Sequence, residues 1–361
     1  MPILTKHPNR NLWDGFLKAD PDEETLPSRP RFDGKRILIT GAGGCIGSAV
    51  AEAMADQGAQ SICLLDSAEH GLDCLQRLCE RRGAVMVPFV PVVGSVEDDA
   101  LLAELFSTHH PQIVIHAAAM KYVTLMESNA LAAARTNIVG TARVLAAAAN
   151  AGVERWILLS TDKAVEPIGI MGATKAVAER LVLTSPDPGR CVIRLCNVLG
   201  TSGSVAPLFV EQIERGDPVT VTDARATRLF ITLKEAVSCI FESASHASDA
   251  RLFAPRRAES RRIEELAQYL VRRSAASSSR IVHIGLRRGE RLHEALWSSA
   301  ENALSSELSA RLWAISCPNQ DVEAVDSMLA SIAEAVRLRD CDRLRETLAP
   351  VFANAGEEVN A

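Results

Sequence analysis

Aromatic residues, long apolar runs and excess positive charge are all scarce in this sequence of 361 residues. Phe, Trp and Tyr together make up 4% of it, with only two tyrosines. No segment approaches the roughly 18 uninterrupted apolar residues of a membrane helix, and the N-terminal segment lacks the apolar core of a secretion signal. The formal net charge of −6 argues against a nucleic-acid or anionic membrane partner. We therefore expect a soluble protein with no membrane segment and no nucleic-acid partner.

The nine cysteines are scattered and include no C-x-x-C pair. This spacing predicts neither a disulfide framework nor a zinc site, so no metal is expected. A chain with many unpaired thiols fits a reducing compartment, and the expected localisation is cytoplasmic.

Short apolar runs alternate with helical patterns between residues 34 and 195. The runs "KRILITG", "SICLLD", "VMVPFVPV", "QIVIHAA", "WILLS" and "CVIRL" are nearly continuous in hydrophobicity, which is typical of strands buried on both faces of a parallel sheet. Their repeated alternation with helices predicts an α/β fold with a Rossmann-like, doubly wound parallel sheet. The helices expected between them span 46–57, 68–82, 97–107, 130–151 and 172–184.

Composition divides the chain into four expected parts. Residues 1–33 are polar and rich in turn formers, and are expected to form a loosely packed N-terminal extension. Residues 34–195 form the Rossmann domain, and 196–300 form a smaller C-terminal α/β substrate-binding lobe, interleaved with it. Residues 301–361 are expected to be a helical region, and the whole chain a homo-oligomer.

A glycine-rich loop, "GAGGCIG", follows the first expected strand. Gly41, Gly44 and Gly47 permit a tight turn and close approach of the backbone to a pyrophosphate at a helix N-terminus. Asp66 ends the second strand, where a carboxylate can accept hydrogen bonds from both ribose hydroxyls. No arginine that would bind a 2′-phosphate occurs in "LLDSAEH", so the motif predicts NAD over NADP.

Residues 160–175, "STDKAVEPIGIMGATK", place a hydroxyl, a carboxylate and an amine directly after a buried strand. Thr161, Asp162 and Lys163 therefore lie where ligands of open parallel sheets gather. Lys175 follows Met171 by four positions, about one helical turn. In the dehydrogenases that this layout resembles, a tyrosine stands at the place of Met171 and acts as the base. Neither tyrosine of this chain is followed by lysine four positions later. Methionine cannot transfer a proton, so "TDK" must supply the acid and base.

The chain resembles the extended short-chain dehydrogenase/reductase family, through "ILITGAGGCIG", "HAAA" and "TNIVGT". More specifically it resembles the C5-inverting nucleotide-sugar 4,6-dehydratases of the UDP-N-acetylglucosamine type, in the branch that carries methionine in place of the tyrosine. That resemblance spans roughly residues 30 to 300 and rests on "HAAAMKYVTLMESN", "LLSTDKAVEPIGIMGATK", "NVLGTSGSVAPLFVEQI", "PVTVTDARATRLFIT" and "GLRRGERLHEAL".

The resemblance implies a reaction on a UDP-sugar substrate with bound NAD as cofactor. Oxidation at C4 of the hexose acidifies the C5 proton, which Lys163 removes as the base. Asp162 is the implied acid for the C6 hydroxyl, and Thr161 would bond the C4 oxygen. Burial beside Lys175 is expected to favour loss of the Lys163 proton.

The resemblance also assigns the binding residues. The implied cofactor contacts are Gly41, Gly44, Cys45, Ile46, Gly47, Asp66, Ser67, Ser95, Val96, Ala117, Ala118, Ala119, Asn137 and Lys175. The implied substrate contacts are Lys121, Asn197, Ser204, Val205, Arg228, Arg287 and Glu290. The chain departs from the family pattern at Ser95, Tyr122, Thr124, Gly169 and Cys196, and most of these departures lie on the substrate side.

Two other functions stay open. A nucleotide-sugar epimerase shares the first oxidation, although such enzymes usually keep the tyrosine. A non-catalytic NAD-binding scaffold would explain Met171, but leaves the retention of "STDK" and Lys175 without a reason.

Overall fold

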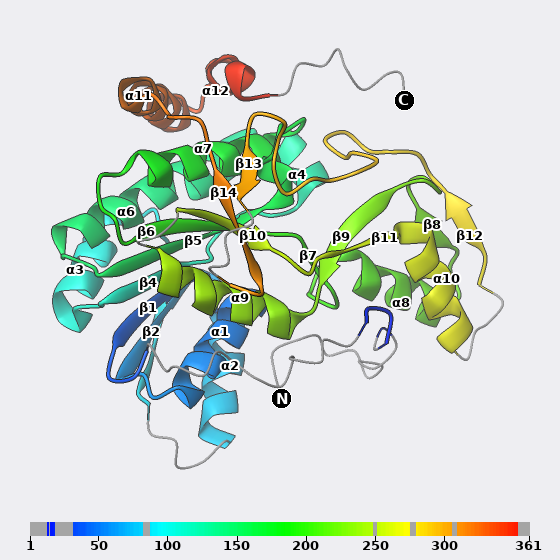
Figure 1. Cartoon of the computed structure of the whole chain (residues 1–361), viewed down its shortest axis with the longest axis horizontal. Coiled ribbons are helices and arrows are strands. Elements are labelled where there is room, and N and C mark those ends of the chain that lie inside the picture. The colour runs from blue at the N-terminus through cyan, green and yellow to red at the C-terminus, as the bar shows by residue number, and fades with distance from the viewer. Residues whose placement is uncertain are drawn as a thin grey trace.

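The computed structural model describes residues 13, 15–18, 32–81, 87–247, 251–274, 279–304 and 309–352. These residues form a large sheet covered by helices and a smaller lobe beside it (Figure 1).

A nine-stranded sheet lies at the centre of the larger part. Its order is β13 (Asn302–Leu304), β14 (Leu312–Ser316), β10 (Leu252–Pro255), β6 (Arg190–Leu195), β5 (Arg155–Thr161), β4 (Ile113–His116), β1 (Arg36–Thr40), β2 (Ser61–Asp66) and β3 (Phe89–Val93). All strands from β10 to β3 pair in parallel, whereas β14 is antiparallel to both of its neighbours. The order β3-β2-β1-β4-β5-β6 is that of a doubly wound sheet, so the predicted Rossmann-like fold is confirmed.

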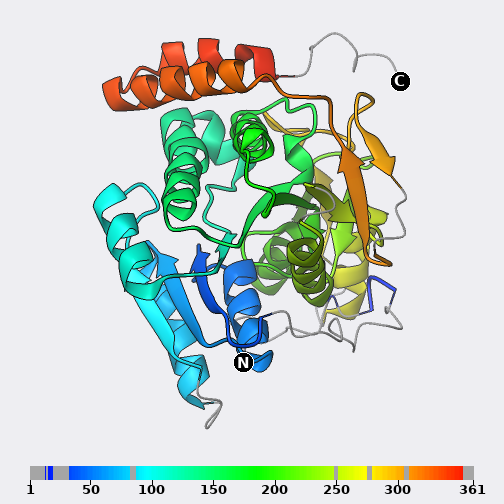
Figure 2. The same ribbon diagram turned by 60° about the vertical axis from the view of Figure 1, so that its left-hand side comes forward.

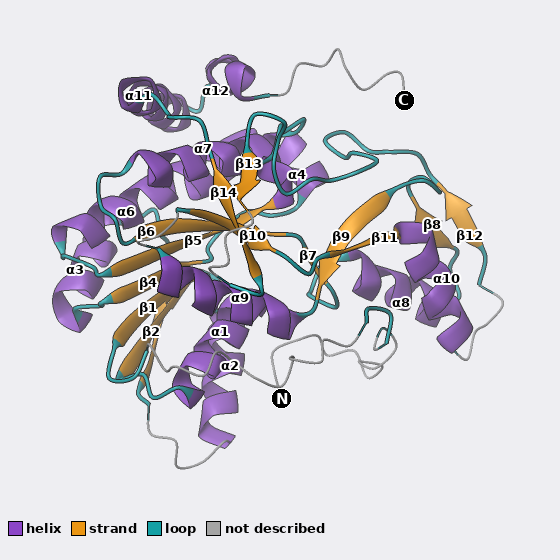
Figure 3. Cartoon of the chain, in the orientation of Figure 1, coloured by secondary structure: helices purple, strands orange, loops and turns teal. Residues whose placement is uncertain are grey.

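Helices cover both faces of this sheet (Figure 3). One face carries α1 (Cys45–Asp56), α2 (Glu69–Arg81) and α9 (Leu233–His246), and the other carries α3 (Asp99–His109), α6 (Thr141–Asn150) and α7 (Ile170–Thr184). With both faces covered, side chains such as Ile39, Ile115 and Leu158 are 0% exposed, which explains the continuous apolar runs of the strands.

The predicted helix 130–151 contains a change of helix type. It begins as α5 (Ala130–Ala134), continues as the π-helix η1 (Arg135–Gly140) and ends as α6. A π-helical turn shifts the register of the side chains and often marks a functional site. Short helices α4 (Val123–Glu127) and η2 (Asp162–Ala164) flank the carboxyl ends of β4 and β5.

A third layer lies outside α7. The helices α11 (Val322–Leu338) and α12 (Cys341–Leu348), followed by the short turn η3 (Ala349–Val351), pack on α5, η1 and α7 (Figure 2). The interval 301–361, for which the sequence predicts helices, also contributes β13 and β14 to the sheet edge.

The smaller lobe contains two short sheets. One has the order β11 (Glu259–Arg262), β9 (Thr227–Ile231) and β7 (Asn197–Val198), and the other pairs β12 (Ile281–His283) with β8 (Val219–Val221). The helices α8 (Val205–Arg215) and α10 (Ile263–Arg273) complete its core.

Part of the N-terminal extension packs against this lobe. Phe16 is 8% exposed and lies edge-on to Phe230, with ring centroids 6.1 Å apart. The Trp13 ring lies against Gly200, where an added Cβ would come within 2.6 Å of its Nε1. A loosely packed arm is expected from the sequence, but these described residues belong to the hydrophobic core of the lobe.

A buried ion cluster joins the sheet edge to α7. Arg194 on β6 donates to both oxygens of Glu179 on α7 and to both oxygens of Glu301, which precedes β13. The three side chains are 5%, 4% and 12% exposed. Ser160 donates to Glu179 at 2.5 Å, so the cluster also contacts the end of β5.

We expect Arg194→Ala to lower the free energy of unfolding by about 3–5 kcal/mol, because two buried carboxylates lose their partner. The matched control is Arg337→Ala at an exposed position of α11, which should leave stability nearly unchanged because the ion pair with Glu334 is screened by solvent. Urea denaturation of both variants measures the difference, and equal losses would contradict a stabilising role for the cluster.

Candidate active site

The glycine-rich loop between β1 and α1 leaves no space for side chains. Gly41 has φ +68°, and a Cβ there would lie 2.5 Å from the Ala118 nitrogen. A Cβ on Gly47 would lie 2.2 Å from the Gly41 oxygen. Gly44 precedes α1 and brings no side chain that could cap it, and the first turn of α1 carries no acidic residue. This helix N-terminus fits the pyrophosphate of a dinucleotide.

Asp66 holds the glycine-rich loop in place. Its Oδ2 accepts a hydrogen bond from the Gly43 nitrogen at 2.8 Å, and its Oδ1 accepts from the Ala68 nitrogen at 2.8 Å. The carboxylate is therefore anchored at the end of β2, with the exposed Ser67 beside it. Its predicted contact with a ribose stays a prediction.

The other predicted cofactor residues lie at the carboxyl ends of neighbouring strands. Ala117 to Ala119 follow β4 and are partly buried, and the Ala118 nitrogen approaches Thr40 Oγ1 on β1 at 3.4 Å. Asn137 in the π-helix accepts from the Met120 nitrogen at 2.8 Å and donates to Thr174 Oγ1 at 2.9 Å. Beyond β3, Ser95 Oγ accepts from the Glu97 nitrogen and Val96 is buried.

His116 is enclosed within the sheet. Its Nδ1 lies 2.7 Å from Thr40 Oγ1 and its Nε2 lies 2.9 Å from Thr141 Oγ1, and the side chain is 0% exposed. Burial, together with the charge of Lys175, lowers the pKa of His116 to about 3. The ring is therefore neutral at neutral pH and serves to join β1, β4 and α6.

A loop from the smaller lobe reaches the glycine-rich loop. The Ser202 nitrogen donates to Cys45 Sγ at 3.2 Å, and the Lys121 amine donates to the Ser202 oxygen at 2.8 Å. Ser204 precedes α8 and Val205 begins it. The structure thus brings Lys121, Ser204 and Val205 to the segment that faces the start of α1.

Thr161, Asp162 and Lys163 lie where β5 ends and η2 begins. Asp162 Oδ1 accepts hydrogen bonds from Thr161 Oγ1 and from the Lys163 amine, both at 2.8 Å. Asp162 is 0% exposed, whereas the Lys163 side chain is 22% exposed. Within this group, Thr161 and Lys163 are partly exposed and Asp162 is enclosed.

Two further polar side chains surround the Lys163 amine. Asn197 Oδ1 accepts from it at 3.3 Å, and Glu294 Oε1 lies 3.8 Å away. Burial opposes the charge on Lys163, but the pairing with Asp162 and Glu294 outweighs it, so the pKa of Lys163 is raised above its ordinary value. Burial therefore favours loss of this proton, as expected from the sequence, but in the protein alone the two carboxyl groups outweigh that effect.

Met171 and Lys175 lie on the same helix, α7, but have different environments. Met171 is 4% exposed and lines a small hollow together with Lys163, Arg291 and Glu294. Lys175 donates to the Leu159 oxygen at 2.6 Å, and burial lowers its pKa to about 8, opposed by Glu179.

The predicted substrate residues of the smaller lobe fall into two groups. Arg228 on β9 is close to the hollow, since its Nε lies 3.9 Å from Glu294 Oε1. Arg287 and Glu290 form an exposed turn in which the Arg287 nitrogen donates to Glu290 Oε2 at 3.0 Å. Arg228 is therefore linked to Lys163 through Glu294, whereas the hydrogen bond of Arg287 to a described residue lies within its own turn.

Sequence reasoning missed Glu294 and Arg291. Both lie in "GLRRGERLHEAL", in a stretch without regular secondary structure, and a lone glutamate after a histidine carries no recognisable spacing. Only the packing of this stretch against η2 and α7 reveals them.

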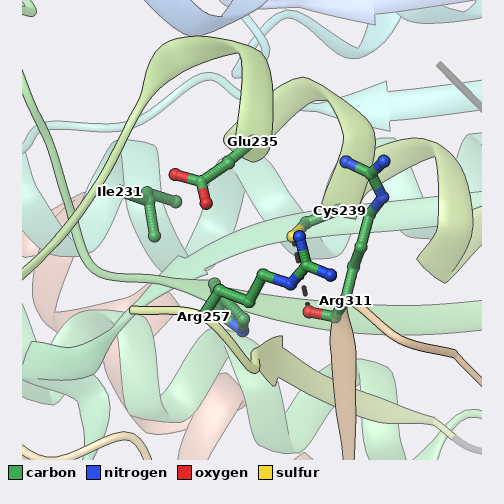
Figure 4. A pocket seen from close by; sticks show the side chains of 6 residues that line it. Ile231, Glu235, Cys239, Arg257 and Arg311 are labelled. Atoms are coloured by element: carbon green, nitrogen blue, oxygen red, sulfur yellow. Dashed lines mark hydrogen bonds between the residues drawn. The ribbon is translucent and has the colours of Figure 1, made fainter. Parts of the chain in front are cut away.

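A second hollow lies beside α9 on the other face of the sheet (Figure 4). It is lined by Ile231, Glu235, Cys239, Pro255, Arg257 and Arg311. Cys239 donates to the Arg311 oxygen at 3.8 Å, and burial raises the pKa of its thiol. None of the residues predicted from the sequence to form the site lines this second hollow.

The sequence profile described as "polysaccharide biosynthesis protein" matches residues 37–315. The chain belongs to this family. Capsular polysaccharide biosynthesis protein CapD of Staphylococcus aureus is 37% identical over 295 residues, which cover 80% of this chain and 49% of CapD. The UDP-glucose 4-epimerase of Rickettsia rickettsii is 37% identical over 222 residues, covering 60% of this chain and 64% of that enzyme.

Solved structures agree with this assignment. Pen from Bacillus thuringiensis superposes with a TM-score of 0.71 at 26% identity, covering 80% of this chain and 90% of Pen. WbmG from Bordetella bronchiseptica, solved in complex with NAD, gives a TM-score of 0.58 at 25% identity and covers 71% and 83%. The chain is an extended short-chain dehydrogenase/reductase.

The chain spans about half the length of CapD. Within the part of the chain that the structure describes, every helix is too short or too polar to span a lipid bilayer.

Gly47→Ala is expected to abolish dinucleotide binding, because its Cβ would force the glycine-rich loop away from the Gly41 oxygen. The control is Gly152→Ala, a remote turn position with φ +67° and nothing within 4 Å, which should cost stability but leave affinity unchanged. Isothermal titration with NAD gives the affinities, and normal binding by Gly47→Ala would refute the proposed cradle.

The buried His116 predicts acid sensitivity. Its pKa is about 3 in the folded protein against 6.5 ordinarily, so the unfolded chain binds more protons between these values. The free energy of unfolding should fall as pH drops from 6.5 towards 3, by up to about 1.4 kcal/mol per pH unit from this group. Urea denaturation at several pH values measures the slope, and His116→Gln should reduce it. An equal slope in the variant would mean that other groups cause the effect.

Proposed function

We propose that this family member is an NAD-dependent nucleotide-sugar 4,6-dehydratase, a lyase that acts on UDP-N-acetylglucosamine or a close UDP-hexose and inverts the configuration at C5. The observation that carries the proposal is the Lys163 amine, held beside two buried carboxyl groups in a hollow lined by Met171. Elimination of water needs a base at C5 and an acid at C6 close together, and this arrangement supplies both.

The chain's own residues divide the work as follows. NAD held by the glycine-rich loop and Asp66 would supply the oxidation at C4 and the reduction at C6, and Asp162 or a water would accept the proton of the C4 hydroxyl. Thr161 lies one hydrogen bond from Asp162 and is placed to bond the C4 oxygen. Lys163 removes the C5 proton once its amine is neutral. The proton for the departing C6 hydroxyl comes from one of the two carboxyl groups beside Lys163, Asp162 or Glu294.

Local cations offset the acidic total charge where a UDP diphosphate would bind. Arg228, Arg287 and Lys121 are the proposed contacts, because guanidinium and ammonium groups hold phosphate oxygens well. Asn197 and Glu290 are proposed contacts to the sugar or ribose. A cytoplasmic location and a homo-oligomeric state are proposed on the family resemblance.

An epimerase is the second candidate. It is favoured by the 37% identity to a UDP-glucose 4-epimerase. It is disfavoured by Met171, because no tyrosine stands at the position that would exchange a proton with the C4 hydroxyl. The buried pair of carboxyl groups around Lys163 would also have no task in a reaction confined to C4.

Incubation of the purified protein with UDP-N-acetylglucosamine should give a product lighter by one water, as measured by mass spectrometry. Lys163→Ala should slow this elimination about 100-fold or more, because it removes the base, while NAD binding persists. Lys234→Ala, at an exposed position on α9, is the matched control and should be fully active. A product of unchanged mass would support the epimerase, and normal elimination by Lys163→Ala would refute the base.

A further inference from the structure

The family resemblance assigns roles to the other residues of the site but none to Glu294. The Glu294 side chain is 4% exposed. It lies three residues after Arg291, in a stretch of the smaller lobe that packs against η2. Its carboxylate oxygen Oε1 lies 3.8 Å from the Lys163 amine and 3.9 Å from Arg228 Nε. A buried carboxylate is costly unless it is paired, so both cations are needed to hold it in place.

The two carboxyl groups beside Lys163 differ in access to the hollow. Asp162 is 0% exposed, and its Oδ1 already accepts from Thr161 and Lys163. It is not among the residues that line the hollow in the described part of the chain, whereas Glu294 and Lys163 both line it. A group that transfers a proton to substrate has to reach it, and Glu294 meets this condition.

We propose, on the basis of the dehydratase function above, that Glu294 is a catalytic residue that takes the Lys163 proton and then delivers it to the departing C6 hydroxyl.

The protons balance over this cycle. The pair starts as an ammonium and a carboxylate, and transfer from Nζ to the carboxylate gives a neutral amine and a carboxylic acid. The amine takes the C5 proton as the C5–H bond breaks and the C5–C6 double bond forms. The acid gives its proton to the C6 oxygen as the C–O bond breaks, and water leaves. The pair is again an ammonium and a carboxylate, so elimination needs no other acid.

The charged surroundings support this division of roles. The groups that face the amine are Asp162, Glu294 and Arg228, and Arg291 lines the same hollow. Burial raises the pKa of Glu294, opposed by Lys163, which favours a carboxyl group that can hold a proton. The neighbouring Cys196 thiol stays neutral, because burial and Asp162 raise its pKa. Asp162 then positions Lys163 and Thr161 through the hydrogen bonds to its Oδ1.

Glu294→Gln tests the proposal in two ways. In the free protein, loss of the negative charge should lower the pKa of Lys163 by roughly one unit or more, measured by the pH dependence of amine labelling at that residue. With substrate, kcat for water loss should fall about 100-fold while KM stays near the wild-type value, because binding is retained and proton transfer is lost. The conservative variant Glu294→Asp should keep the high lysine pKa and recover part of kcat.

Glu346→Gln, an exposed position on α12, serves as the control and should change neither value. Unchanged kcat and an unchanged Lys163 titration in Glu294→Gln would overturn the assignment of Glu294. A lower lysine pKa with unchanged kcat would overturn its role as acid. If wild-type protein releases no water from the UDP-sugar, the dehydratase function fails, and the lysine titration still decides whether Glu294 and Lys163 share a proton.

Discussion

The site depends on one electrostatic arrangement, the amine of Lys163 between the carboxyl groups of Asp162 and Glu294. Each carboxyl comes from a different part of the fold: Asp162 from the end of β5, and Glu294 from the chain that returns from the smaller lobe. Asp162 and Lys163 are adjacent in the chain and pair with each other, whereas Glu294 comes near Lys163 only where the smaller lobe packs against η2. The same contact that completes the site therefore also holds the two parts of the molecule together.

The sheet fixes the other half of this arrangement. The carboxyl ends of β1, β4 and β5 lie side by side, so the glycine-rich loop, the alanine-rich segment and the Thr161 to Lys163 segment face one region. The π-helix places Asn137 where it bonds both the backbone at Met120 and Thr174 on α7. On the far side, Arg194 ties α7 to the sheet edge through Glu179 and Glu301. The helix that carries Met171 and Lys175 is thus fixed from both directions.

Much of the fold could be predicted from the sequence. The interiors of strands such as "RILIT" and "SICLLD" are apolar, and the glycine-rich loop between a strand and a helix is typical of a dinucleotide-binding turn. Thr161, Asp162, Lys163 and Met171 could be placed because they follow a recognisable strand. Glu294 could not, since its partner Lys163 is 131 positions away and comes near only through tertiary packing. The same holds for Phe16, which is buried because it packs against Phe230, a residue far away in the sequence. The raised pKa of Lys163 also needed the structure, because burial and ion pairing act in opposite directions and only the distances decide between them.

The central claim is that Lys163 removes the proton at C5 of a UDP-hexose, after which an exchangeable proton is added from the opposite face. Running the reaction with UDP-N-acetylglucosamine in D₂O and locating deuterium in the product by NMR tests this most directly. Because the replacing proton exchanges with solvent, the account predicts a product that has lost one water and carries deuterium at C5. A product that keeps its original C5 hydrogen would contradict it, whatever change occurs at C4.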